Sequence, residues 1–188
     1  MKKLIPSVLL SLSLFRVSAQ DAKNNQTATD FPTGIRKVVQ AYRNNFSTLQ
    51  GNPSSRDGNS GTFASKVCIT GAVSCEIRRY ASVKDKSASW TCLLFEGDEF
   101  SEAAKVYRST CTELKKTAID IGGGQSLGFA GRISTPDENL RFTGTNLKAE
   151  SKNTAFMNLI AGVELVNNYA GWEVRLSFYS GSIPRDEE

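Results

Sequence analysis

The order of the hydrophobic patterns along the chain constrains its fold more than any other sequence feature. Two segments, residues 35–49 and 100–114, repeat apolar side chains at the spacing of one helix face. Each is followed by runs in which apolar and polar residues alternate, as in half-buried strands. Short turns between the runs indicate antiparallel pairing, and two one-sided helices can cover only one face of a sheet.

The sequence therefore predicts an α+β fold, in the form of a two-layer domain. We expect an antiparallel β-sheet of about six strands with two amphipathic helices on one face. The predicted element order is α-β-β-β-α-β-β-β, with a fourth strand optional after the second helix.

Turn and cap residues set the expected boundaries. The first helix is predicted from Asp30–Phe31–Pro32 to a C-cap at Gly51, with a loop over residues 50–61. The second is predicted from about Asp98 until residues 121–124 stop it. The runs with strand character are residues 63–69, 73–77, 90–95, 127–133, 140–147 and 172–178, with a hairpin turn at Thr70–Gly71 and a long apolar run at 156–166.

The first 19 residues have the three regions of a secretory signal peptide in order. Lys2 and Lys3 form a positive region, an apolar run follows, and Val17–Ser18–Ala19 places small residues before a predicted cut at Gln20. The apolar run is too short to cross a membrane, and no later run approaches the ~20 residues required. We expect an exported protein, periplasmic or secreted, without a transmembrane span.

Composition divides the rest of the chain into three parts. Residues 20–30 are polar and are expected to form a flexible leader, residues 31–182 a single α+β domain, and residues 183–188 an acidic tail. The domain is long enough to bury one core without a metal.

The chain contains no histidine. This absence excludes histidine-dependent catalysis of the Ser-His-Asp or Cys-His type and histidine-ligated metal sites. The net charge of +4 is also misleading, because residues 1–19 hold Lys2, Lys3 and Arg16 and no acidic residue. Without them the charge is +1, and a general attraction to nucleic acid loses its basis. We expect no nucleic-acid partner, no cofactor and no metal site.

The chemistry of the four cysteines is the next question. Cys68, Cys75, Cys92 and Cys111 contain no C-x-x-C motif and lack the close spacing of a four-thiolate zinc site. Structural disulfides are the expected state in an exported chain, although four cysteines allow three pairings. We expect Cys68–Cys75 across the hairpin and Cys92–Cys111 in the core, while the alternating pattern around Cys68 and Cys75 argues for opposite faces.

Carboxylates and aromatic residues provide the other candidate sites. Paired acids can serve glycoside hydrolysis, but three of the clustered Glu96, Asp98, Glu99 and Glu102 fit the start of the second helix. Three aromatic residues are candidates for a ligand groove on the exposed sheet face: Tyr169, Trp172 and Tyr179.

No catalytic residue emerges from these comparisons. The predicted function is that of a non-catalytic binding or accessory module, stabilised by disulfides, with a protein or small-ligand partner in the envelope or extracellular space. The alternative is a small extracytoplasmic enzyme, either a carboxylate-based hydrolase or a cysteine redox protein.

Overall fold

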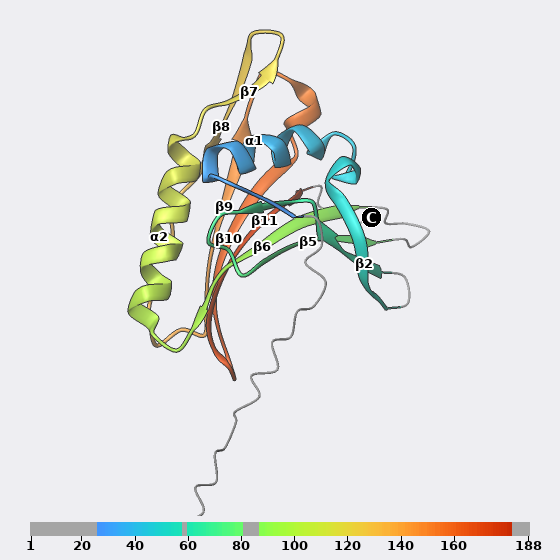
Figure 1. The fold of residues 1–188 in the computed structure, drawn as a ribbon. Helices are drawn as coiled ribbons and strands as arrows, with labels where there is room; N and C mark the ends of the chain where they lie inside the picture. The colour runs from blue at the N-terminus through green and yellow to red at the C-terminus, as the bar shows by residue number, and fades with distance from the viewer. Residues whose placement is uncertain (1–25, 58–59, 81–86, 182–188) are drawn as a thin grey trace, which may run out of the picture.

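The structure, a computed structural model, describes residues 26–57, 60–80 and 87–181 of the chain. The predicted signal peptide, most of the predicted leader and the predicted acidic tail lie outside these residues. The described part is an α+β domain, in which a large antiparallel sheet is covered on one face by helices (Figure 1). No helix in these three described ranges is long and apolar enough to cross a membrane.

The main sheet is larger than predicted. In the described ranges, nine strands pair antiparallel in the order β2-β3-β5-β6-β11-β10-β9-β8-β7. Their bounds are β2 Gln50–Asp57, β3 Ser60–Ser65, β5 Ser74–Tyr80, β6 Ala88–Gly97, β7 Ile119–Gly122, β8 Gln125–Ala130, β9 Phe142–Glu150, β10 Leu159–Asn168 and β11 Gly171–Ser180.

One long crossover organises the sheet. After β6 the chain enters α2 (Phe100–Lys116), which carries it to β7 at the far edge. Antiparallel strands then return one by one until β11, the last strand, pairs with β6 in the middle of the sheet. The second helix was predicted correctly, with Glu102 in its first turn and Lys115 and Lys116 in its last, as the helix dipole favours. It ends before residues 121–124, because Thr117 is already extended and β7 follows.

The first helix is shorter than predicted. α1 (Phe31–Tyr42) begins at Asp30, whose side chain accepts a hydrogen bond from the Thr33 backbone N–H at 3.0 Å. It ends at Tyr42 because Asn45 and Phe46 adopt left-handed backbone angles, which asparagine tolerates better than most residues. A short 3-10 turn, η1 (Ser47–Leu49), follows. Phe46 is buried as the helical pattern predicted, but it enters the core from this turn.

Residues 50–57 form a strand, whereas the sequence predicted a loop there. β2 is an edge strand of the described sheet that pairs with β3, and its register shifts at Pro53. An edge position tolerates proline, because one side of the strand needs no ladder donor. The turn-forming residues of this segment are therefore part of an irregular edge strand and not of a loop.

A small parallel pair lies beside the main sheet. β1 (Thr27–Thr29) pairs with β4 (Val67–Ile69), so part of the predicted flexible leader forms a strand. The predicted strand over residues 63–69 is broken at Ser65–Lys66, and the Ser65 hydroxyl donates to Val67 O at 2.7 Å. β3 pairs with β5, whereas β4 turns away to β1. The predicted hairpin between residues 63–69 and 73–77 is therefore formed by β3 and β5, with β4 as an excursion.

The core lies between the helices and the inner face of the sheet. Ile35, Val38 and Val39 of α1 and Tyr107 of α2 are fully buried. On the sheet side, Trp90 and Phe178 pack against each other with ring centroids 5.9 Å apart. Side chains of opposite parity on the same strands point to the other face, which the helices leave open.

Candidate functional site

The three aromatic residues predicted to form a groove do not meet. Tyr169 is fully exposed in the turn between β10 and β11, while Trp172 is buried against Phe100 of α2, with ring centroids 5.0 Å apart. Tyr179 lies on the open face of the sheet, where its hydroxyl donates to Asn146 Oδ1 at 3.1 Å. The ring covers Gly162 on the intervening strand, where an added Cβ would lie 3.1 Å from it. None of the three candidates lines the hollow on that face, although Tyr179 interacts electrostatically with Glu164, which does.

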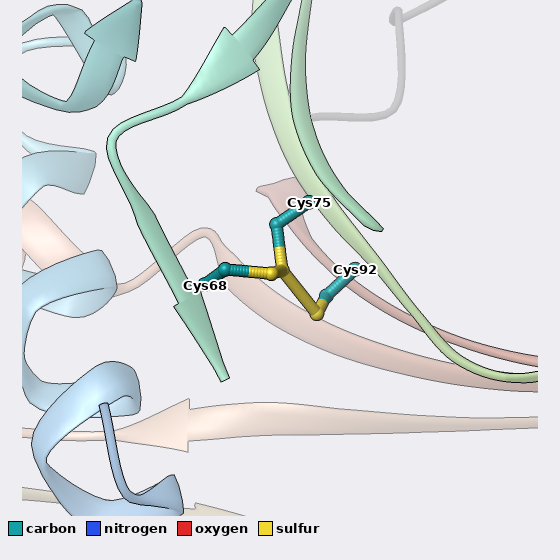
Figure 2. Close-up of side chains that lie close together, drawn as sticks. All are labelled: Cys68, Cys75 and Cys92. Atoms are coloured by element: carbon teal, nitrogen blue, oxygen red, sulfur yellow. A yellow bond between two sulfur atoms is a disulfide. The ribbon is translucent and has the colours of Figure 1, made fainter. Parts of the chain in front are cut away.

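Three of the cysteines converge, from three different strands. Cys68 lies on β4, Cys75 on β5 and Cys92 on β6, and their Sγ atoms all lie within 4.8 Å of one another (Figure 2). Cys75 is central, because its Sγ contacts those of both Cys68 and Cys92. The corresponding Cα–Cα distances are 5.4 Å to Cys68 and 4.1 Å to Cys92. We call these three residues the cysteine cluster.

The cluster differs from the expected pairing of Cys92 with Cys111. Cys92 is the direct cross-strand partner of Cys75 in the β5–β6 register, whereas Cys111 belongs to α2. Within the part of the chain that the structure describes, Cys111 is free of any disulfide, and it is completely buried. Burial raises the pKa of its thiol to about 11, although hydrogen bonds with Thr145 and Tyr107 act in the opposite direction.

A candidate binding feature is a hollow of about 360 Å³ on the open face of the sheet. It spans four adjacent strands at the centre, β5, β6, β11 and β10. Its lining is mostly polar and consists of Ser74, Glu76, Arg78, Tyr80, Ser89, Thr91, Leu93, Glu164, Arg175 and Ser177. We call this feature the open-face hollow.

The floor of the open-face hollow is a pair of hydroxyl groups. Thr91 on β6 and Ser177 on β11 are direct cross-strand partners, and their side-chain oxygens lie 3.0 Å apart. Ser89, two residues before Thr91, adds a third hydroxyl to the same strand face. Because a hydroxyl both donates and accepts, this floor can hydrogen-bond a polar ligand of either kind.

Charges of both signs surround this floor. On β5, Arg78 lies 3.8 Å from Glu76, and both side chains are well exposed. On β11, Arg175 forms an ion pair with Glu173, which is largely buried and also accepts a hydrogen bond from Asn168 Nδ2. Glu173 thus fixes the Arg175 guanidinium at the rim, leaving it with unused N–H donors.

Glu164 on β10 is the uncommitted charge. It is directly opposite Arg175 in the β10–β11 register, but Arg175 turns to Glu173. Within the described chain, the half-buried Glu164 carboxylate has neither a hydrogen bond nor an ion pair. Burial raises the pKa of Tyr179, and the negative charge of Glu164 raises it further. The Tyr179 phenol therefore remains a hydrogen-bond donor at neutral pH beside an acceptor with free capacity.

The clustered carboxylates of residues 96–102 do not form a comparable site. Glu99 is the N-cap residue of α2 and Glu102 lies in its first turn, while Glu96 is on β6. Among the described residues, the acidic and cysteine groups close enough to share a metal ion are those of the cysteine cluster.

Sequence reasoning missed the open-face hollow because it followed the aromatic residues. A usable signal was present in the polar parity of two strands, where Glu76 and Arg78 alternate with buried residues on β5, as Arg175 and Ser177 do on β11. The adjacency of these strands was not visible, because it depends on the crossover through α2.

Comparisons of the chain with models of known families, with curated proteins and with solved structures gave no match. The site is therefore interpreted from its own geometry.

Proposed function

We propose that the protein is a non-catalytic binding module that takes a small polar ligand in the open-face hollow. The observation that carries this proposal is the polar lining of a hollow at the centre of an uncovered sheet face, with Glu164 uncommitted within it. Ligand sites in proteins range from about 300 to 1,000 Å³, and the hollow, at about 360 Å³, suits a ligand at the small end of this range.

The lining indicates the chemistry of the ligand. Glu164 accepts hydrogen bonds or pairs with a cation, Arg78 and Arg175 bind a carboxylate or phosphate, and the Thr91–Ser177 floor binds hydroxyl or amide groups. Acidic and basic side chains are balanced in the lining, two of each. A zwitterionic ligand such as an amino acid or a short peptide satisfies this set, because its ammonium group fits Glu164 and its carboxylate an arginine.

Binding is favoured over catalysis by the way the hydroxyls are used. A serine or threonine nucleophile needs an adjacent base that takes its proton. Thr91 and Ser177 are instead hydrogen-bonded to each other. Cys111, which lies outside the cysteine cluster and forms no disulfide with the described residues, is buried on the helix side with a raised pKa, which keeps it in the unreactive thiol form.

The proposal is tested by titrating the mature protein with a panel of free amino acids and dipeptides. Backbone amide shifts followed by NMR should move at Thr91, Glu164 and Ser177. Glu164→Gln removes the charge with little change of shape and should weaken binding at least about tenfold, since hydrogen bonds to a charged group contribute about 1.5–3 kcal/mol. The matched control is Glu113→Gln, an exposed position on α2, which should leave affinity unchanged.

Two results would contradict the proposal. One is an absence of shifts on these strands across the whole panel. The other is equal affinity of the Glu164 and Glu113 variants for a ligand that does bind, because this would place the binding site elsewhere.

A further inference from the structure

We propose that the cysteine cluster is a thiol–disulfide exchange site, in which Cys75 moves one disulfide bond between Cys68 and Cys92. This inference is independent of the binding function proposed above. The cluster contains three sulfur atoms, and a sulfur atom forms one disulfide at a time. In the structure the Cys75 sulfur lies within bonding reach of both Cys68 and Cys92. The oxidised cluster therefore holds one disulfide, which contains Cys75, and one thiol that contacts this disulfide.

The backbone geometry favours Cys68 as the resting partner. The Cα–Cα distance of 5.4 Å between Cys68 and Cys75 lies close to the commonest value for disulfides, about 5.5–6 Å. The distance of 4.1 Å between Cys75 and Cys92 falls below the usual range of about 4.4–6.8 Å. We therefore assign the resting disulfide to Cys68–Cys75 and the thiol to Cys92.

The exchange step balances without a reagent. The Cys92 thiolate attacks Cys75 Sγ, the Cys75–Cys92 bond forms, and the Cys68–Cys75 bond breaks. Cys68 leaves as a thiolate and takes up the proton that Cys92 released. The number of disulfides is unchanged, so no oxidant or reductant is consumed. The three side chains are 7%, 2% and 0% exposed for Cys68, Cys75 and Cys92, which shields the exchange from outside thiols.

The two disulfides have different mechanical effects. Cys68–Cys75 ties β4 to β5, whereas Cys75–Cys92 joins two strands that are already paired in the sheet. β4 is otherwise held by its three-residue pairing with β1 and by non-covalent contacts with α1, β5 and β6. Exchange to Cys92 therefore releases the covalent hold on the β1–β4 pair, leaving the main sheet cross-linked. This makes the cluster a switch for the stability of one corner of the fold.

Trypsin distinguishes the two forms, because of where the lysines and arginines lie. Cleavage after Lys66 and Arg78 places Cys68 and Cys75 on one peptide, residues 67–78. Cys92 lies on residues 87–105 and Cys111 on residues 109–115. A Cys68–Cys75 disulfide gives an internally bridged 67–78 peptide, whereas Cys75–Cys92 links 67–78 to 87–105. The oxidised mature protein should be alkylated during acid denaturation, digested without reduction and analysed by mass spectrometry.

In the wild-type protein we expect the bridged 67–78 peptide to dominate, with Cys92 and Cys111 alkylated. Cys68→Ser should convert the main product to the 67–78/87–105 cross-link, while Cys92→Ser should leave only the internal bridge. Cys111→Ser is the control and should reproduce the wild-type pattern. Under native conditions, cleavage after the exposed Lys66 should be several-fold faster in the Cys68 variant than in the Cys92 variant, because β4 is no longer tethered.

Slow alkylation of the native wild-type protein tests the exchange itself. Both singly labelled forms, one on Cys92 and one on Cys68, should accumulate from a pool that starts with one disulfide. Labelling of Cys92 alone would overturn the exchange. A Cys92–Cys111 cross-link would overturn the cluster, as would free Cys75 and Cys92 in the oxidised Cys68 variant. Three unbridged cysteines with a bound metal in the native mass spectrum would assign the cluster to metal binding instead.

Discussion

At the scale of single residues, the buried polar groups under the sheet determine how stability responds to pH. The hydroxyl groups of Tyr107 on α2 and Thr145 on β9 are hydrogen-bonded, with their oxygens 2.6 Å apart. The Cys111 thiol interacts with both of these side chains. Burial raises the pKa of Tyr107 as well. The fold therefore favours the neutral forms of the Tyr107 hydroxyl and the Cys111 thiol. Alkaline pH favours their charged forms and so lowers the free energy of unfolding.

The Cys111 thiol makes a specific contribution to that alkaline sensitivity. Its pKa is about 11 in the folded protein against 9.0 as the ordinary value, so the unfolded chain loses this proton first. Since stability falls with pH wherever the unfolded state binds fewer protons, the free energy of unfolding should decline between about pH 9 and pH 11. Cys111→Ala should flatten that decline, as measured by urea denaturation at a series of pH values.

The comparison of the two proteins isolates the thiol, because Tyr107, whose pKa burial also raises, is present in both. If the free energy of unfolding declines equally with pH in wild type and variant, the pKa of the Cys111 thiol is not raised by burial, contrary to the structure. A uniform offset between the two curves reports only the lost packing.

At the scale of elements, one buried hydrogen bond links Ser65, where the chain breaks between β3 and β4, to Trp90 in the middle of the sheet. Trp90 on β6 donates its indole N–H to the Ser65 hydroxyl at 2.9 Å, and Ser65 in turn donates to Val67 O. Ser65 and Trp90 are both fully buried. This bond holds the point at which the chain leaves the sheet, just before Cys68.

Ser65→Ala should therefore destabilise the protein by about 1–3 kcal/mol, because the indole N–H is left buried without an acceptor. Equilibrium urea unfolding measures the loss. The control is Ser109→Ala, an exposed serine on α2 whose hydroxyl donates to Val106 O, where a change of less than about 0.5 kcal/mol is expected. If Ser65→Ala lowers the free energy of unfolding no more than Ser109→Ala does, the Trp90 indole N–H has another acceptor, contrary to the structure.

An element could be predicted from the sequence when its hydrophobic pattern is complete within its own residues. α2 has a continuous apolar stripe and charges that suit its dipole, and β5, β6 and β11 alternate cleanly, so each was evident in the sequence. β2 escaped prediction because an edge strand with proline and glycine lacks an alternating pattern. In α1, the burial of Phe46 and Leu49 matched a helix that in fact ends at Tyr42.

The site was less predictable for the same reason. That Cys92 faces Cys75 rather than Cys111 follows from the β5–β6 register, and that Cys68 joins them follows from the break at Ser65–Lys66. Neither is encoded in the spacing of the cysteines. The open-face hollow likewise requires β6 and β11 to be neighbours, although 86 positions separate Thr91 from its partner Ser177.

At the scale of the whole molecule, the export signal is the main prediction still to be tested. The full chain expressed in a secretory host should lose residues 1–19 and begin at Gln20, because Val17–Ser18–Ala19 supplies the small residues that precede a cleavage site. N-terminal sequencing and the intact mass of the exported protein measure this directly. Replacing Ala19 by a bulky residue such as tryptophan should block the cut, while the same change at Ala28 is the control outside the signal. Retention of Met1 on an exported protein would contradict the prediction.

The position of β11 also fixes when this fold can be completed. As the last strand, ending at Ser180, it fills the gap between β6 and β10 in the middle of the sheet. Of the nine strands a ribosome makes this one last, so the two halves of the sheet cannot be joined until Ser180 has been synthesised. Contacts between such distant segments are slow to form. The order of synthesis therefore keeps the two halves of the sheet apart until β11 has been made.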